Sequence, residues 1–185
     1  MKHAFCKLTL TLLLFVCLPS AGLASKLLLT PSSVTLIEAP DVSEARLLLD
    51  FALPTLPEGD EVYYADLRLS LPSLGALQEF DIYEIGTDWV AGTISWEGPW
   101  GNAGGDIRGD RIDAWITDER TGNLIKFVIT ESIQRFMSQT SDNYGFLVTA
   151  NKENTKLLET PMESVTLTVF TGPNLNPSSR SRVIK

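Results

Sequence analysis

The chain of 185 residues is poor in the side chains on which many enzymes and metal sites depend. Its single histidine, His3, and its two cysteines, Cys6 and Cys17, all fall within the first 24 residues. Beyond residue 24, Ser-His-Asp and Cys-His catalysis, the usual zinc sites and disulfides are therefore excluded. The chain also lacks a G-x-S-x-G nucleophile motif and a glycine loop that could cradle a phosphate. The sequence predicts that the protein is not an enzyme.

The only long apolar run lies near the start of the chain. Lys2 and Lys7 precede it, it covers residues 8–18, and the small residues 22–24 follow it. This pattern is typical of a secretory signal peptide, and the run is too short for a stable membrane span. Lipid attachment at Cys17 is the alternative, but Val16 stands where a small residue is needed. We expect cleavage after Ala24 and a protein that is secreted, periplasmic or on the cell surface, with no membrane insertion after cleavage.

Basic residues are outnumbered, with 15 lysines and arginines against 23 aspartates and glutamates, a net charge of −8. Nucleic-acid binding requires a basic face that displaces counterions, so the balance argues against a nucleic-acid partner. It also argues against binding to anionic lipids. The simplest role of the acidity is solubility outside the cell.

Apolar residues recur with a period of two over most of the chain. Short turn signals such as "LPTLPEGD" and "DERTGN" separate these stretches. Alternation of this kind predicts half-buried strands, and many short strands with frequent turns predict an all-β antiparallel β-sandwich, jelly-roll-like, over residues 25–172. The predicted strands are 46–51, 64–71, 80–85, 125–130, 144–149 and 164–170. A loose polar tail is expected at 173–185, with "RVIK" as an optional last strand.

One short helix is predicted over residues 131–138. Thr130 is a suitable N-cap, and Glu131 would lie in the first turn. Ile133, Phe136 and Met137 form one apolar stripe, which we expect to cover an open end of the sandwich.

Three of the four tryptophans lie in "DWVAGTISWEGPW", next to the glycine-rich acidic run "GNAGGDIRGDRID". Asp106, Asp110 and Asp113 in that run are hard oxygen ligands on a flexible segment, which makes them candidate calcium ligands. Their spacing does not match an EF-hand loop, and an ordinary acidic surface loop is the alternative. The run also contains the tripeptide 108–110, Arg-Gly-Asp, to which we assign no function.

Residues 46–149 contain, in this order, the blocks "RLLLDFALPTLPEGDEVYYADLRLSL", "DIYEIGTDW", "GTISW", "KFVITESIQRFM" and "NYG". Blocks of this kind in this order resemble the DNRLRE domain, which is also classed as carbohydrate-binding module family 96. The segment 25–44 lacks the family's usual opening strand and turn, and Val128 replaces its usual aspartate. The resemblance implies a β-sandwich implicated in binding polysaccharides.

The family resemblance suggests roles for the first two tryptophans, and the neighbouring residues suggest roles for the other two. Trp89 and Trp96 belong to the family's recurring motif, so we expect them to be core residues. Trp100 lies between glycines and is predicted to be an exposed ring that stacks on a sugar, with folding back onto the core as the alternative. Trp115 alternates with its neighbours and could face either way. Trp115, Asn102, Arg108 and Arg111 complete the predicted ligand site.

Two functions follow from these observations. The first is a non-catalytic, exported module that binds a polysaccharide or surface glycan, of neutral or mixed charge because the protein is acidic. The second is a structural or adhesive module of the cell surface or envelope. An exposed array of aromatic rings would favour the first function, and an unpaired edge strand would favour the second.

Overall fold

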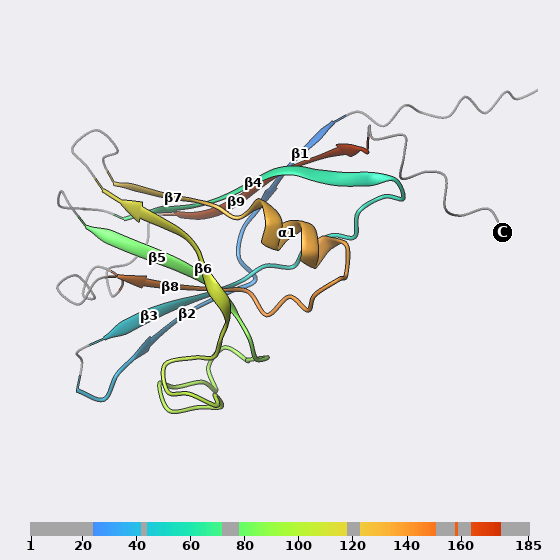
Figure 1. Ribbon diagram of the computed structural model, residues 1–185. Coiled ribbons are helices and arrows are strands. Elements are labelled where there is room, and N and C mark those ends of the chain that lie inside the picture. Colours follow the sequence, from blue (N-terminus) through green and yellow to red (C-terminus); the bar gives the residue numbers. More distant parts are fainter. Residues whose placement is uncertain are drawn as a thin grey trace, which may run out of the picture.

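The computed structural model describes residues 24–41, 44–71, 78–117, 123–150, 158 and 164–174. In this part of the chain, nine strands form two antiparallel sheets that face one another (Figure 1). Sheet A has the order β1-β9-β4-β7, and sheet B has the order β2-β3-β8-β5-β6. The strands of sheet A are β1 (Ser25–Leu29), β9 (Ser164–Pro173), β4 (Asp60–Ser70) and β7 (Leu124–Val128). Those of sheet B are β2 (Ser33–Glu38), β3 (Ala45–Asp50), β8 (Phe146–Ala150), β5 (Glu79–Ile85) and β6 (Ile107–Ile116).

The strand order is that of a jelly roll once β2 is set aside as an additional edge strand. The chain changes sheet at every connection except β2 to β3 and β5 to β6. Two interlocked Greek keys produce this alternation, and all the described pairings are antiparallel. The prediction of an all-β antiparallel sandwich is confirmed.

The two-residue period explains which side chains fill the space between the sheets. In β4, Val62, Ala65, Leu67 and Leu69 are buried, and the outward positions between them carry polar or aromatic side chains. A register shift between Val62 and Tyr64 accounts for the one break in the alternation. Sheet B contributes the opposing layer, which includes Leu47, Leu49, Phe80, Ile82, Phe146 and Val148.

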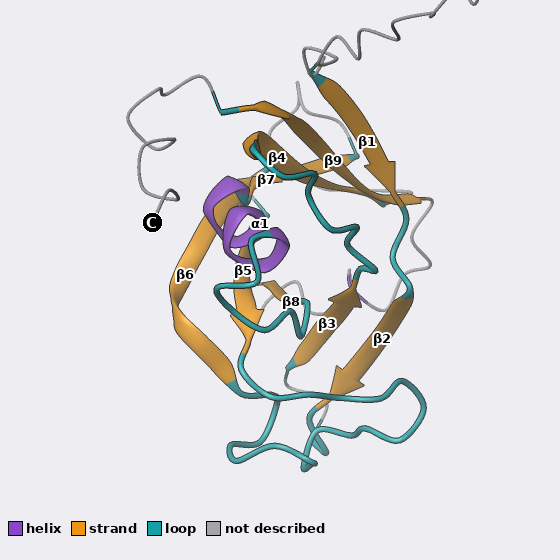
Figure 2. Ribbon diagram, turned by 90° about the vertical axis from the view of Figure 1, so that its right-hand side faces the viewer, coloured by secondary structure: helices purple, strands orange, loops and turns teal. Residues whose placement is uncertain are grey.

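Helix α1 (Thr130–Met137) fills one open end of the sandwich (Figure 2). Ile133, Phe136 and Met137 are buried in the main core, which confirms the predicted apolar stripe. The N-cap is Ile129 rather than Thr130, because the hydroxyl of Thr130 accepts a hydrogen bond of 3.0 Å from the backbone N–H of Ala65. The predicted cap is therefore wrong by one residue: Thr130 ties the helix to sheet A and leaves the first turn without a side-chain cap.

Other sequence predictions are corrected or fall outside the described residues. The glycine-rich run is a loop only up to Asp106, since strand β6 begins at Ile107. The segment "TISW", which the sequence pattern predicts as a short strand that carries Trp96, is not a strand and contributes one isolated bridge, between Ser95 and Gly98. Strand β9 ends at Pro173, one residue beyond the predicted domain boundary. The signal peptide up to residue 23, and the tail from residue 175 with "RVIK", lie outside the described part.

Candidate functional site

The tryptophan-rich loop, residues 86–106, folds back onto the outer face of sheet B, where it appears in yellow-green below the sheets in Figure 1. It builds a second, smaller apolar core on the side of sheet B that faces away from sheet A. The buried members of this core are Ile37, Leu48, Ile85, Trp100 and Leu147, and the residues packed against them are Tyr83, Trp89, Ile94, Trp96 and Tyr144. One face of the sandwich is therefore covered by its own loop.

Trp100 lies inside this second core rather than on the surface. Its residue is only 8% exposed, and its indole Nε1 donates a hydrogen bond of 2.8 Å to the carbonyl oxygen of Ser95. The prediction of an exposed ring is wrong, because the loop curls so that the ring is directed at the sheet instead of solvent. Of the two alternatives, folding back onto the core is the one observed.

Trp89 and Trp96 are half-buried at the rim of the same core. The indole of Trp89 donates a hydrogen bond of 2.7 Å to the carbonyl oxygen of Tyr144. The guanidinium of Arg46 lies 4.9 Å from the centre of the Trp96 ring, where it covers one face by a cation–π contact. A β-carbon at Gly104, whose φ is +85°, would come within 2.9 Å of both side chains. The three rings thus hold the loop against sheet B.

The three candidate calcium ligands are not brought together. Asp106 receives hydrogen bonds from the backbone N–H groups of Gly101 (2.8 Å) and Asn102 (2.9 Å) and from the hydroxyl of Thr87 (2.8 Å). These bonds, led by the one from Gly101, hold the pKa of Asp106 below its ordinary value. Asp106 therefore acts as an internal clamp of the loop.

Asp110 and Asp113 lie further along β6. Asp110 is exposed, and Asp113 accepts a hydrogen bond of 2.7 Å from the backbone N–H of Val128, which ties β6 to the edge of β7. No cluster of three or more histidine, cysteine, aspartate or glutamate side chains that could hold a metal ion occurs in the described part of the chain.

The remaining predicted ligand residues separate into two groups. Asn102 is exposed and its side chain bonds to Asp106, whereas Trp115 packs against the main core with its Nε1 buried. Asn102 therefore belongs to the tryptophan-rich loop, and Trp115 belongs to the main core. Arg108 and Arg111, in contrast, lie near one another on a bulge of β6.

The bulge of β6 results from unequal spacing against β5. Ile82 pairs with Asp113 and Glu84 pairs with Arg108, so two steps along β5 correspond to five steps along β6. The extra residues bend the strand outwards at Gly109, whose φ is +71°. Bulges occur often beside functional sites, because they redirect side chains out of the regular pleat.

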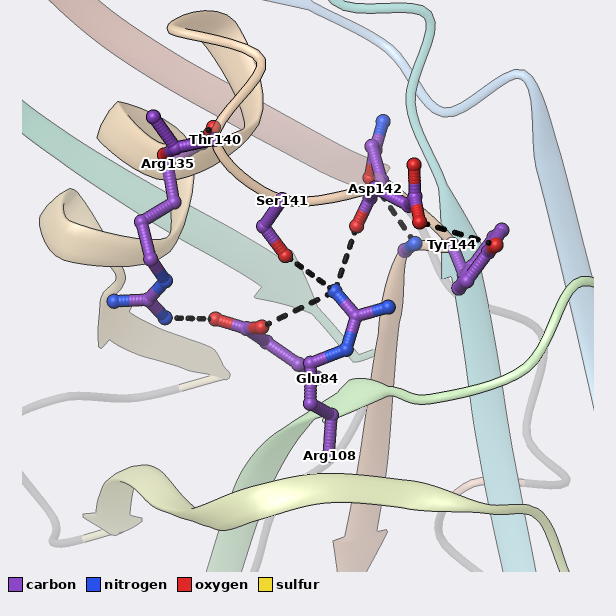
Figure 3. A network of polar contacts seen from close by, with 9 residues as sticks. Glu84, Arg108, Arg135, Thr140, Ser141, Asp142 and Tyr144 are labelled. Atoms are coloured by element: carbon purple, nitrogen blue, oxygen red, sulfur yellow. Dashed lines mark hydrogen bonds and ion pairs between the residues drawn. The ribbon is translucent and has the colours of Figure 1, made fainter.

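Glu84 joins the bulge to helix α1 (Figure 3). Its carboxylate is almost fully buried at 3% exposure and forms an ion pair with Arg135 of α1. Arg108 lies on the other side, 3.9 Å from Glu84, and donates hydrogen bonds to the Ser141 hydroxyl (2.6 Å) and the Asp142 carbonyl oxygen (2.8 Å). Arg108 is thus held inside this network, which leaves no free Arg-Gly-Asp motif.

A cavity of about 590 Å³, here called the α1 cavity, opens between the bulge of β6 and the first turn of α1. It is lined by three arginines, Arg108, Arg111 and Arg135, and by three carboxylates, Glu84, Asp110 and Glu131. Its size is in the range of small-molecule sites.

The outer face of sheet A carries a group of side chains in contact with one another that we name the aromatic strip. It consists of Lys26, Phe170, Tyr64 and Lys126, from β1, β9, β4 and β7. The rings of Tyr64 and Phe170 are 6.1 Å apart between centroids. Lys26 Nζ lies 5.8 Å from the Phe170 ring and Lys126 Nζ lies 5.6 Å from the Tyr64 ring. Phe170 is 38% exposed, so the strip presents aromatic surface to solvent.

Two polar residues and one apolar residue lie directly beside Tyr64 and Phe170 of the strip. Register places Thr168, Asp66 and Val128 in the next row across β9, β4 and β7. Asp66 is 1% exposed and accepts a hydrogen bond of 2.6 Å from Arg68 Nε. This bond raises the pKa of the Arg68 guanidinium. The strip was missed in the sequence, because its members come from four separate strands and each occupies an ordinary outward position.

No protein-family model matches the chain, and no curated protein matches it. The resemblance to the DNRLRE domain therefore stays a prediction. In the part of the chain that the structure describes, no helix is long and apolar enough for a membrane span.

Proposed function

We propose that the chain is an exported, non-catalytic module that binds a polysaccharide through the outer face of sheet A. The observation that supports this proposal is the aromatic strip, where Tyr64 and Phe170 lie side by side on the outer face of sheet A and Phe170 is 38% exposed. Aromatic faces are apolar, and they can pack against the C–H face of a sugar ring while polar neighbours bind its hydroxyl groups.

The residues around the strip suit hydroxyl recognition. Arg68 retains guanidinium N–H groups beyond those bonded to Asp66, and Lys26 and Lys126 are donors at the two ends. The sequence blocks that resemble the DNRLRE family support the same class of ligand. Because the protein is acidic overall but this face carries three cations, a neutral glycan or one with scattered acid groups is favoured over a polyanion.

A glycan array with the mature protein tests the proposal. Phe170→Leu and Tyr64→Leu remove one ring each and keep apolar bulk, and we expect either change to weaken binding about tenfold, or about 1.4 kcal/mol. Val90→Ala is the matched control, since Val90 is 63% exposed on the loop over sheet B. Binding that survives loss of both rings would remove the strip as the site.

Export has its own test. Strand β1 begins at Ser25, directly after the predicted cleavage position. N-terminal sequencing of exported protein is expected to start at Ser25, and a lipid-modified Cys17 at the N-terminus would contradict this.

The structural or adhesive function is kept as a second candidate because of two apolar neighbours of the strip. Leu28 is 62% exposed and Val128 is 45% exposed, and exposed apolar surface is typical of protein contacts. If this function holds, sedimentation should show self-association that Phe170→Leu abolishes, and the glycan array should be blank.

A further inference from the structure

A buried carboxylate fixes the guanidinium of Arg68 on the outer face of sheet A. Asp66 and Arg68 are two positions apart on β4, so their side chains lie on the same face of the sheet. Asp66 is 1% exposed, and its two oxygens accept hydrogen bonds from Arg68 Nε at 2.6 Å and from Arg68 Nη2 at 3.3 Å. Because the acceptor is buried and both bonds lie on one edge of the planar guanidinium, they hold the group in one orientation.

The other edge of the same guanidinium is available to a ligand. A guanidinium carries five N–H groups in a rigid planar fork, and the two bonds to Asp66 use those on the Nε side. Among the described residues, Nη1 of Arg68 has no hydrogen-bond partner, and the side chain is 46% exposed. One N–H group of Nη1 and one of Nη2 are therefore directed away from Asp66 in parallel. Such a pair of donors matches two oxygen atoms that lie side by side on a ligand.

The fixed guanidinium lies on the same face as the rings of Tyr64 and Phe170. Asp66 stands between Tyr64 and Arg68 along β4, and the side chain of Arg68 reaches back to it. Register places Lys126 opposite Arg68, yet Lys126 Nζ lies 5.6 Å from the centre of the Tyr64 ring. Both cations thus extend from one row of the sheet towards the rings. The hydroxyl groups at the edge of a sugar stacked on the strip would face these donors.

We propose that Arg68 makes the glycan site selective for sugars that keep two neighbouring hydroxyl groups free, an inference that rests on the function proposed above. The outer N–H pair of Arg68 donates to the two hydroxyl oxygens while the sugar ring packs on Tyr64 and Phe170. Asp66 is the positioning residue, because it sets the direction of that pair without touching the sugar.

This selectivity translates into a preference for linkage. Internal units of a 1,4-linked glycan keep free hydroxyl groups on the second and third ring carbons, which are neighbours. Internal units of a 1,3-linked glycan have no two free hydroxyl groups on neighbouring ring carbons. The site therefore favours 1,4-linked chains over 1,3-linked chains of the same sugar.

The test is a polysaccharide array that carries 1,4-linked and 1,3-linked β-glucan, β-xylan and β-galactan, with a polyuronate added. Each pair holds the sugar constant and changes the linkage, and long chains make the contribution of chain ends negligible. We expect the 1,4-linked member of each pair that binds to be bound at least about tenfold more tightly, because hydrogen bonds to a charged donor are lost in the other member.

One variant and a matched control assign the preference to Arg68. Arg68→Lys keeps the charge but loses the planar donor pair, so binding to 1,4-linked chains should fall to the level of the 1,3-linked chains. Arg68 is exposed, so this variant is expected to fold. Arg111→Lys is the control, since Arg111 is 50% exposed and is likewise bonded to an aspartate, Asp81, but on sheet B. It should leave both affinities unchanged.

The outcomes separate this inference from the function on which it rests. Equal binding to the two linkages, or a preference that persists in Arg68→Lys, overturns the role of Arg68 and leaves glycan binding standing. Binding to the polyuronate alone would mean that the donor pair takes a carboxylate, which also overturns it. Binding to none of the polysaccharides contradicts both proposals.

Discussion

The indole of Trp100 and the carbonyl oxygen of Ser95 are joined by a hydrogen bond of 2.8 Å that closes the tryptophan-rich loop on itself. A backbone hydrogen bond of 2.9 Å from Ser95 to Gly98 closes the same turn. Together with the burial of the ring against Ile85 and Leu147, this bond makes Trp100 part of the fold. The ring of Trp100 therefore fills a core, with Trp89 and Trp96 packed half-buried at its rim.

Substitution of Trp100 should reduce stability. We expect Trp100→Ala to lower the free energy of unfolding by about 3–5 kcal/mol, because it removes a large buried side chain and leaves a cavity. Trp100→Phe keeps most of the apolar volume and loses the bond to Ser95, so its cost should be about 1 kcal/mol. Urea denaturation followed by circular dichroism measures both. An unchanged midpoint for Trp100→Ala would show that the ring is on the surface after all.

The ion pair between Glu84 and Arg135 should contribute measurably to stability. A double-mutant cycle with Glu84→Gln and Arg135→Gln should give a coupling free energy of about 1–3 kcal/mol, because the carboxylate is buried and its partner is in contact. The pair Glu79–Arg111 is the control, with side chains 47% and 50% exposed and a separation of 3.9 Å. Its coupling should stay below about 1 kcal/mol, as is usual for exposed pairs. Equal coupling in the two cycles would contradict the role given to burial.

Gly145 is the glycine at which a side chain is least tolerable. Its φ is +85°, and a β-carbon there would collide with the carbonyl oxygen of Leu49 on the neighbouring strand. Gly59 has the same φ of +85° but nothing within 4 Å of the corresponding position. Gly59→Ala should therefore cost only the conformational penalty, about 1–2 kcal/mol. Gly145→Ala should cost distinctly more, and thermal unfolding of both variants measures the difference. Similar losses would mean that β8 moves to make room.

Acidification should loosen the loop through Asp106. Hydrogen bonds from Gly101, Thr87 and Asn102 favour its charged form and lower its pKa from 3.8, the ordinary value. A carboxyl with a lowered folded-state pKa contributes stability above the unfolded-state value, and this contribution is lost as the pH falls through the folded-state value. We expect Asp106→Asn to flatten the pH dependence of stability below about pH 4.

Thr87→Val tests the cause of that pKa shift. It removes one donor to Asp106 and should move the carboxyl pKa back towards its ordinary value. The pKa can be followed by carboxyl-carbon NMR in both proteins. An identical titration of Asp106 in Thr87→Val and in the unmodified protein would argue against the hydrogen-bond explanation.

Much of the sandwich follows from the sequence, because an alternating strand must turn one side to a core. The stretches around Leu47, Leu67, Phe80, Phe127 and Val169 alternate in the sequence, and each is a strand whose apolar side is buried. The apolar stripe of α1 was predictable in the same way, because the helical period places its apolar residues on one face. Strand β6 was not predictable, since its one glycine and two aspartates are residues typical of loops and a bulge interrupts its alternation.

The sequence by itself determined the class of fold, the short helix and the absence, beyond residue 24, of histidine and cysteine chemistry, since these depend on composition and local periodicity. Only the tertiary structure decided which outer face is covered. The period of a strand sets which side chains point outwards, but not whether a loop or solvent meets them. Sheet B is covered by the loop that carries Trp100, and sheet A presents Tyr64 beside Phe170, two residues that strand register alone brings together.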